Sequence, residues 1–291
     1  MAATGRGGWL AAIGWTIAFL ALSWIGAGLL GFVFAWLITG DVHAVSAWIR
    51  TVSGPSILVQ GVAFLLAALF ATWLVGIKAA KLDLTVLRWR DTGSPLRGAG
   101  WGLLAGVLAA VAALLVAVML TPSGWSADAG GPLGYAASLA RTGAVLAPAA
   151  LAEEVVFRGV PLVLLAAVFG RGTALLVIAV IFALGHAFNP HVSGLALGNI
   201  ALASVFLGLV FYAPGGLWTA FGAHFGWNMT LAALDAPVSG LPFRIPLLDY
   251  DPGGSVLVTG GAFGPEGGLA ATVALTAACL LMVQRLRKDG A

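Results

Sequence analysis

The stretch LAPAALAEEVVFRGVPLVLLAAVF, residues 146–169, places two adjacent carboxylates, Glu153 and Glu154, inside an otherwise apolar run. A charged side chain near the centre of a membrane-spanning helix costs about 2.5–3.5 kcal/mol, so such a pair requires a partner or a function. Arg158 follows Glu154 by four residues, and residues four apart lie on one face of a helix. We therefore expect Glu154 and Arg158 to pair, which directs Glu153 elsewhere and makes Glu153 the better candidate for a general base.

The composition of the chain is that of a membrane protein. Of its 291 residues, 60% are hydrophobic and 9% are charged, whereas soluble domains carry about 25% charged residues. The mean hydropathy is +1.03. Because about 20 apolar residues cross a bilayer once, we predict an all-α polytopic membrane protein with about eight transmembrane helices. We expect residues 1–291 to form a single membrane domain.

Breaks in hydropathy at Pro, Gly and charged residues set the bounds of the predicted spans. The spans are 9–39, 56–77, 99–121, 140–168, 172–189, 193–213, 216–234 and 268–284. Basic residues gather between the second and third spans and after the last one, which predicts that both regions and both termini are cytoplasmic. The basic residues behind the net charge of +3 therefore indicate the orientation of the chain in the membrane. They do not indicate a nucleic-acid partner. The single cysteine, Cys279, excludes an internal disulfide.

Three further polar side chains lie in the predicted apolar spans: His186, His224 and Asn228. His224 and Asn228 are four residues apart, so one helix face presents both an imidazole and a carboxamide. Such a face can donate hydrogen bonds to a developing oxyanion, and the imidazole can also bind a metal. Each group alone also fits a structural role, but their combination with the glutamate pair points to function. Neighbouring helices are expected to approach closely at three nearby glycines, Gly185, Gly222 and Gly226.

The order of these motifs resembles a known family. Glu-Glu-x-x-x-Arg at 153–158, Phe-x-x-x-His at 182–186 and His-x-x-x-Asn at 224–228 are similar to the motifs of one group of intramembrane proteases. The group unites CAAX prenyl endopeptidases with bacteriocin-processing and self-immunity proteins, as the CPBP or Abi family. The resemblance covers residues 140–234, the expected catalytic core helices. Two later runs resemble the loop after the third motif in many bacterial members but say little about chemistry, 236–240 and 259–267.

The resemblance implies a membrane-embedded endopeptidase that acts on a membrane-associated peptide or protein substrate in the lipid bilayer. Carried over by position, the motif residues have three implied roles: Glu153 and His186 activate the attacking water, His224 and Asn228 stabilise the tetrahedral oxyanion, and Glu154 with Arg158 braces the site.

The metal dependence of the family leaves a second possibility open. Its members are commonly called metalloproteases, and a Zn²⁺ ion would be held here by Glu153, His186 and His224. The chain contains no His-Glu-x-x-His motif, which would place two imidazoles on one helix face. The sequence therefore favours direct activation of water.

Two other functions use the same residues. A non-hydrolytic immunity or binding protein would keep the fold without cleaving its partner, and a proton-coupled transporter would use the Glu and His groups as carriers. The absence of an inverted repeat in the sequence speaks against the transporter. The Ala-rich and Gly-rich composition hints at a high-GC bacterium, so we expect the bacterial plasma membrane as the location. The sequence leaves open whether the substrate is prenylated.

Overall fold

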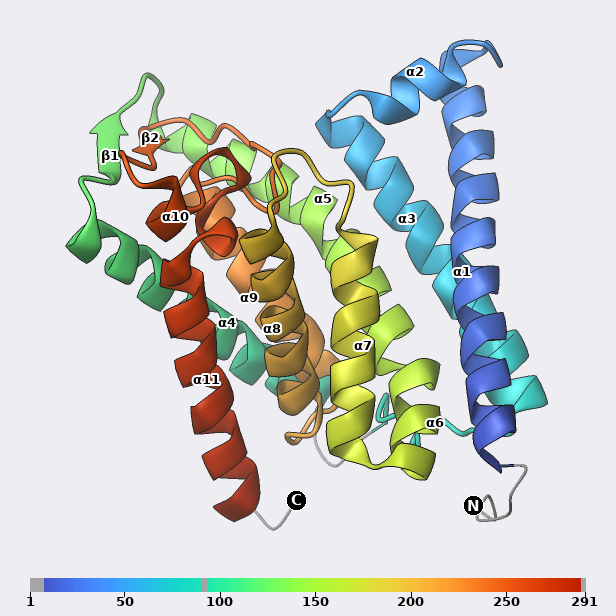
Figure 1. The fold of residues 1–291 in the computed structure, drawn as a ribbon. Helices are drawn as coiled ribbons and strands as arrows, with labels where there is room; N and C mark the ends of the chain where they lie inside the picture. Colours follow the sequence, from blue (N-terminus) through green and yellow to red (C-terminus); the bar gives the residue numbers. More distant parts are fainter. Residues whose placement is uncertain (1–7, 91–93, 289–291) are drawn as a thin grey trace. The chain divides into compact units, whose positions relative to one another are not determined.

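The computed structural model describes residues 8–90 and 94–288, and these are mostly helical (Figure 1). The all-α class predicted from composition is confirmed. The helices are α1 (Gly8–Thr39), α2 (Val45–Arg50), α3 (Gly54–Ala71), α4 (Pro95–Leu120), α5 (Pro132–Arg158), α6 (Val160–Phe169), α7 (Arg171–Gly185), α8 (Gly194–Phe211), α9 (Leu217–Ala233), α10 (Val256–Thr259) and α11 (Leu269–Lys288). A π-helix, η1 (Thr72–Ala79), continues α3, and two 3₁₀ turns precede α11, η2 (Gly261–Phe263) and η3 (Pro265–Gly267).

The described residues form two compact units. The first contains residues 8–90 and 144–178, and the second contains residues 94–143 and 179–288. The unit boundaries therefore fall inside α5 and α7. The second unit also contains a small antiparallel sheet of two strands, β1 (Gly124–Ala127) and β2 (Leu248–Asp251).

Each predicted span coincides with helical structure, although the bounds differ. Within the described residues, five helical segments are long and apolar enough to cross a membrane: Gly8–Thr39, Gly54–Ala79, Pro95–Leu120, Gly194–Phe211 and Leu269–Lys288. The chain is thus an integral membrane protein by the length and apolar character of its helices. The predicted number of eight crossings is not confirmed, because the remaining helices are shorter or more polar.

The fourth predicted span, 140–168, is wrong in its bounds. Helix α5 already begins at Pro132, and the helix is interrupted at Gly159, whose ψ of −123° is not helical. Pro161 explains the interruption, because a proline has no N–H to donate to the carbonyl four residues earlier. The segment that carries the glutamate pair therefore ends at Arg158, and α6 starts a new helix.

The first unit is held together by small residues and by one tryptophan. Ala63, Ala67 and Ala71 are buried at four-residue intervals along α3, the helix that packs against α1. Small side chains at this interval let two helix backbones approach each other. Trp24 of α1 stacks on Phe64 and meets the ring of Phe157 edge-on, with centroids 6.1 and 6.0 Å apart. The end of α5 is thereby packed against α1.

The second unit is organised around a close contact between α4 and α9. A Cβ atom at Gly102 or Gly106 of α4 would collide with a backbone carbonyl of α9. The same holds in the other direction for Gly222 and Gly226 of α9 against α4. The expected close approach at these two α9 glycines is confirmed, whereas the matching glycines of α4 were not predicted from the sequence. The contact turns the glycine face of α9 towards α4, so the opposite face of α9 is turned away from α4.

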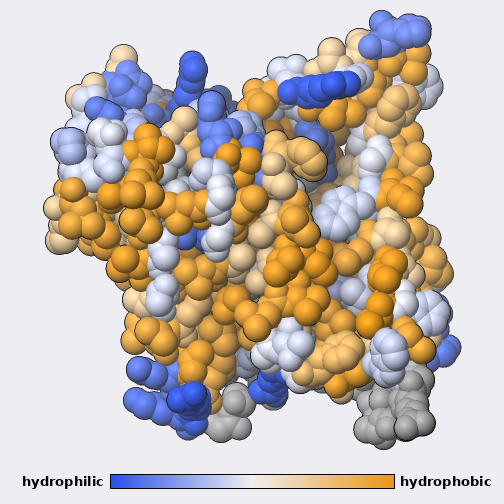
Figure 2. Space-filling view, viewed as in Figure 1, coloured by the Kyte–Doolittle hydropathy of each residue, from blue (hydrophilic) through white to orange (hydrophobic). Residues whose placement is uncertain are grey.

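The outer surfaces of the long helices carry apolar side chains. On the face shown in Figure 2, hydrophobic residues cover much of the length of helices such as α1 and α11, and hydrophilic residues gather at helix ends. Ile25 and Leu29 of α1 and Leu280 and Leu281 of α11 are among the exposed apolar residues. Such surfaces are suited to contact with lipid.

Replacing Gly102 by alanine tests the α4–α9 contact. We expect Gly102→Ala to destabilise the protein by about 1–3 kcal/mol, because the added methyl group forces two backbones apart. Gly100 lies on the same helix with open space around it, so Gly100→Ala is the matched control. The stability of the Gly100→Ala variant should be unchanged or slightly higher than that of the wild type, since alanine favours the helix. Thermal unfolding in detergent measures both, and equal melting temperatures for the two variants would contradict the account.

Candidate active site

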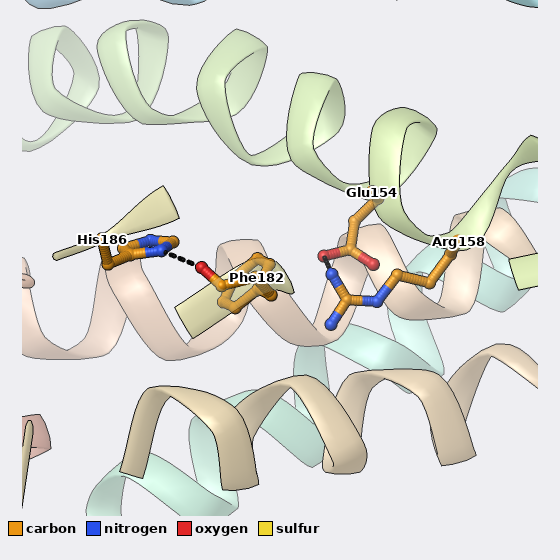
Figure 3. Close-up of polar contacts among 4 residues, drawn as sticks. All are labelled: Glu154, Arg158, Phe182 and His186. Carbon is orange, nitrogen blue, oxygen red and sulfur yellow. Dashed lines mark hydrogen bonds and ion pairs between the residues drawn. The ribbon is translucent and has the colours of Figure 1, made fainter. Parts of the chain in front are cut away.

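The glutamate pair lies in α5, within the first unit. Arg158 Nη1 is 3.2 Å from Glu154 Oε1, and both side chains are fully buried (Figure 3). The ion pair predicted from the four-residue spacing is confirmed. Glu153 is half-buried. Adjacent residues on a helix point about 100° apart, so the Glu154–Arg158 pair leaves Glu153 on a different face of α5.

His186 directly follows the end of α7, in the second unit. Its Nδ1 atom is 2.8 Å from the carbonyl oxygen of Phe182 (Figure 3). A carbonyl oxygen can only accept a hydrogen bond, so Nδ1 carries the hydrogen, and the lone pair of the neutral ring is at Nε2. The ring of Phe182 contacts both imidazoles, with centroid distances of 4.6 Å to His186 and 6.2 Å to His224. The hydrogen bond to the Phe182 carbonyl thus fixes the orientation of the His186 ring.

His224 and Asn228 lie on the face of α9 that is turned away from α4. Each is two residues beyond a contact glycine, Gly222 or Gly226, which places it about 200° further around the helix. Together with His186 they line a cavity of about 30 Å³ in the second unit. A cavity of this size holds one or two water molecules. Three of the predicted site residues, one in the turn after α7 and two on α9, are therefore brought together.

Apolar side chains form most of the remaining wall of this cavity. They come from α7, α8 and α11 and include Phe182, Ile200, Phe206, Leu207 and Leu275. Hydrogen bonds and charges act more strongly in such surroundings than in bulk water. The cavity therefore combines a few polar groups with a largely apolar wall.

One carboxylate of this site was not predicted from the sequence. Glu266, in η3, is buried and lines the same cavity as the two histidines and Asn228. The chain contains only three glutamates, and Glu266 is the one outside the pair in α5. Its rarity and its place in the run 259–267 were the available signals, but nothing in the local sequence indicated which residues it would contact.

The predicted site residues fall into two groups. Glu153, Glu154 and Arg158 belong to the first unit, whereas the two histidines and Asn228 belong to the second. The structure describes the geometry of each group within its own unit.

The residues of the second unit do not fit a three-ligand zinc site. Across residues 8–90 and 94–288, no group of three or more His, Cys, Asp or Glu side chains is arranged to hold a metal ion. The carboxylate nearest to the histidines in this unit is Glu266, and both of its oxygens already accept hydrogen bonds, from Trp227 and Ser239.

The fold and the cavity define a class: an integral membrane protein with a small histidine- and asparagine-lined cavity among its helices. Residues 134–230 match the family model described as type II CAAX prenyl endopeptidase Rce1-like. This segment contains all three motifs, so the chain carries an Rce1-like region and its predicted resemblance to the CAAX-protease family is confirmed there. Neither the curated proteins nor the solved structures gave a match.

Replacing Arg158 by methionine tests the buried ion pair. The change leaves the Glu154 carboxylate buried without its cation, so we expect the free energy of unfolding to fall by about 3–5 kcal/mol. The double variant Glu154→Gln/Arg158→Met should recover part of this loss, because it removes both charges. Arg141→Met is the matched control, since Arg141 is an exposed residue of the same helix. Denaturant unfolding in detergent measures the effect, and a loss no larger than that of the control would contradict a contribution from the pair.

Proposed function

We propose that the protein is an intramembrane endopeptidase that hydrolyses a peptide bond of a membrane-associated peptide or protein. Residues 140–234 form the catalytic core in this proposal. The observation that carries it is the gathering of His186, His224 and Asn228 around one small cavity in the second unit. The Rce1-like match of residues 134–230 supports the same reaction.

In the proposed reaction, Glu153 and His186 activate a water molecule. The Glu153 carboxylate takes a proton from the water molecule. The oxygen of that water molecule then attacks the carbonyl carbon of the peptide bond. The hydrogen bond between Nδ1 of His186 and the Phe182 carbonyl supports the part of His186 in holding this water, because it fixes the ring. The proton then passes to the amine nitrogen as the C–N bond breaks, which releases a new carboxyl end and a new amino end.

His224 and Asn228 stabilise the negative charge that develops on the carbonyl oxygen. Both side chains can donate hydrogen bonds, and their shared face of α9 presents them together. The α4–α9 contact helps to keep this face in place, since backbone meets backbone at the glycines. The buried Glu154–Arg158 pair fixes the last turn of α5, and with it the direction of the neighbouring Glu153.

We propose the bacterial plasma membrane as the location, with both termini in the cytoplasm. Arg285, Arg287 and Lys288 in the last turn of α11 support a cytoplasmic C-terminal end. The terminal residues themselves, 1–7 and 289–291, lie outside the described part of the chain.

The role of Glu153 is tested by Glu153→Gln. The amide keeps the size of the side chain but cannot take a proton from water, so we expect cleavage to be abolished while the protein stays folded and inserted. The assay uses purified protein in vesicles with a panel of membrane peptides, with and without a C-terminal prenyl group, and detects new peptide ends by mass spectrometry. Full activity of the variant would remove Glu153 from the chemistry.

Asn228→Ala tests the stabilisation of the oxyanion. Removing one such donor typically lowers kcat about 10²–10³-fold, and we expect a loss in this range with the unfolding temperature nearly unchanged. Thr230→Val is the matched control on the same helix, because the Thr230 hydroxyl donates to the carbonyl of Gly226 and does not line the cavity. A kcat for Asn228→Ala equal to that of the control would argue against this role.

A further inference from the structure

Glu266 accepts hydrogen bonds on both carboxylate oxygens inside the second unit. The side chain is 7% exposed and lies in the wall of the cavity. Oε1 accepts from the indole Nε1 of Trp227 at 2.8 Å. Oε2 accepts from the backbone N–H of Ser239 at 2.5 Å and from the Ser239 hydroxyl at 2.7 Å. A buried carboxylate with this set of donors is held in one orientation.

The backbone around Glu266 is fixed from α8. Buried Asn199 donates its carboxamide hydrogens to the carbonyl oxygens of Glu266 and Gly268, both at 2.8 Å. The Asn199 side-chain oxygen in turn accepts from the Thr272 hydroxyl at 2.7 Å. The carboxylate is therefore presented by an anchored segment, although the segment has little regular secondary structure.

The contacts of Glu266 join the two elements that carry the histidines. Trp227 precedes Asn228 on α9. On the other side, the carbonyl oxygen of Ser239 accepts from the Asn189 carboxamide at 3.0 Å, and the Asn189 backbone N–H donates to the carbonyl of His186 at 3.1 Å. A continuous series of hydrogen bonds thus runs from the helix of His224 and Asn228, through Glu266, to the turn of His186.

We propose that Glu266 is a positioning residue, which holds the turn of His186 at a fixed separation from the helix face of His224 and Asn228. The inference rests on the proposed function for its catalytic consequence. Glu266 acts through Trp227 and Ser239, and it takes no part in the proton transfers.

The chemistry of the two donors explains why a carboxylate is needed. An indole N–H and a backbone N–H can only donate, and Glu266 offers an acceptor oxygen to each. A glutamine of the same shape would turn its amide hydrogens towards one of them. Replacing Trp227 by phenylalanine removes one of these donors and lets a glutamine fit.

The test is a double-mutant cycle with Glu266→Gln and Trp227→Phe, assayed for cleavage in vesicles. Misplacement of a catalytic group by about 1 Å can cost about 10²-fold in rate, so we expect Glu266→Gln to lower kcat about 10-fold to 100-fold. The KM should change little, because substrate contacts are kept. Adding Trp227→Phe should return kcat close to that of Trp227→Phe alone. A purely structural role would lower the folded fraction but leave the kcat of the folded protein unchanged, and that result would overturn the proposal.

A distance measurement tests the same claim without any catalysis. In a Cys279→Ser background, which removes the single native cysteine, spin labels are placed at Phe188 and Leu108, exposed by 98% and 59%. Phe188 follows the turn of His186, and Leu108 lies on α4, the helix packed against α9. The distance distribution should broaden in Glu266→Gln and also in Trp227→Phe, because each change interrupts the same series of hydrogen bonds. An unchanged distribution would refute the positioning role, whereas failure of the wild type to cleave any peptide would refute only the proposed function.

Discussion

Polar groups among apolar helices must find their hydrogen-bonding partners within the protein, and this constraint governs both parts of the candidate site. All three glutamates of the chain lie in such surroundings or at their edge. Glu154 is matched by Arg158 within one helical turn, and Glu266 is matched by donors from α9 and from the loop that follows it. Each match restricts a side chain to one orientation. The polar groups therefore fix the geometry around them, which flexible apolar contacts alone would not do.

The glycine contact between α4 and α9 supplies the complementary restraint. Because the two backbones touch, α9 cannot rotate about its axis without a clash. The face that bears His224 and Asn228 is then turned away from α4 towards the cavity. Backbone packing on one side and hydrogen bonds on the other thus support a catalytic face that needs few polar groups of its own.

Much of the fold could be predicted from the sequence, because long apolar runs give a strong signal for membrane helices. The Glu154–Arg158 pair was also predictable, since a spacing of four residues is a local property of a helix. The interruption at Gly159 was missed, although Pro161 signals it, because hydropathy continues unbroken through that point.

The parts of the site that could not be predicted depend on contacts between residues far apart in the chain. The glycines of α4 gave no indication that α9 would be their partner, more than 100 residues later. Glu266 lies in an irregular segment where no helical or strand periodicity gives the direction of a side chain. Its partners Trp227 and Ser239 became apparent only in the folded structure.

The most direct test of the central claim is cleavage in water labelled with ¹⁸O. Purified wild-type protein in vesicles is mixed with membrane peptides, and the products are analysed by mass spectrometry. The account predicts paired fragments in which the new carboxyl end carries ¹⁸O, because the attacking oxygen comes from water. Intact peptides together with a pH-dependent proton flux across the vesicle membrane would contradict it.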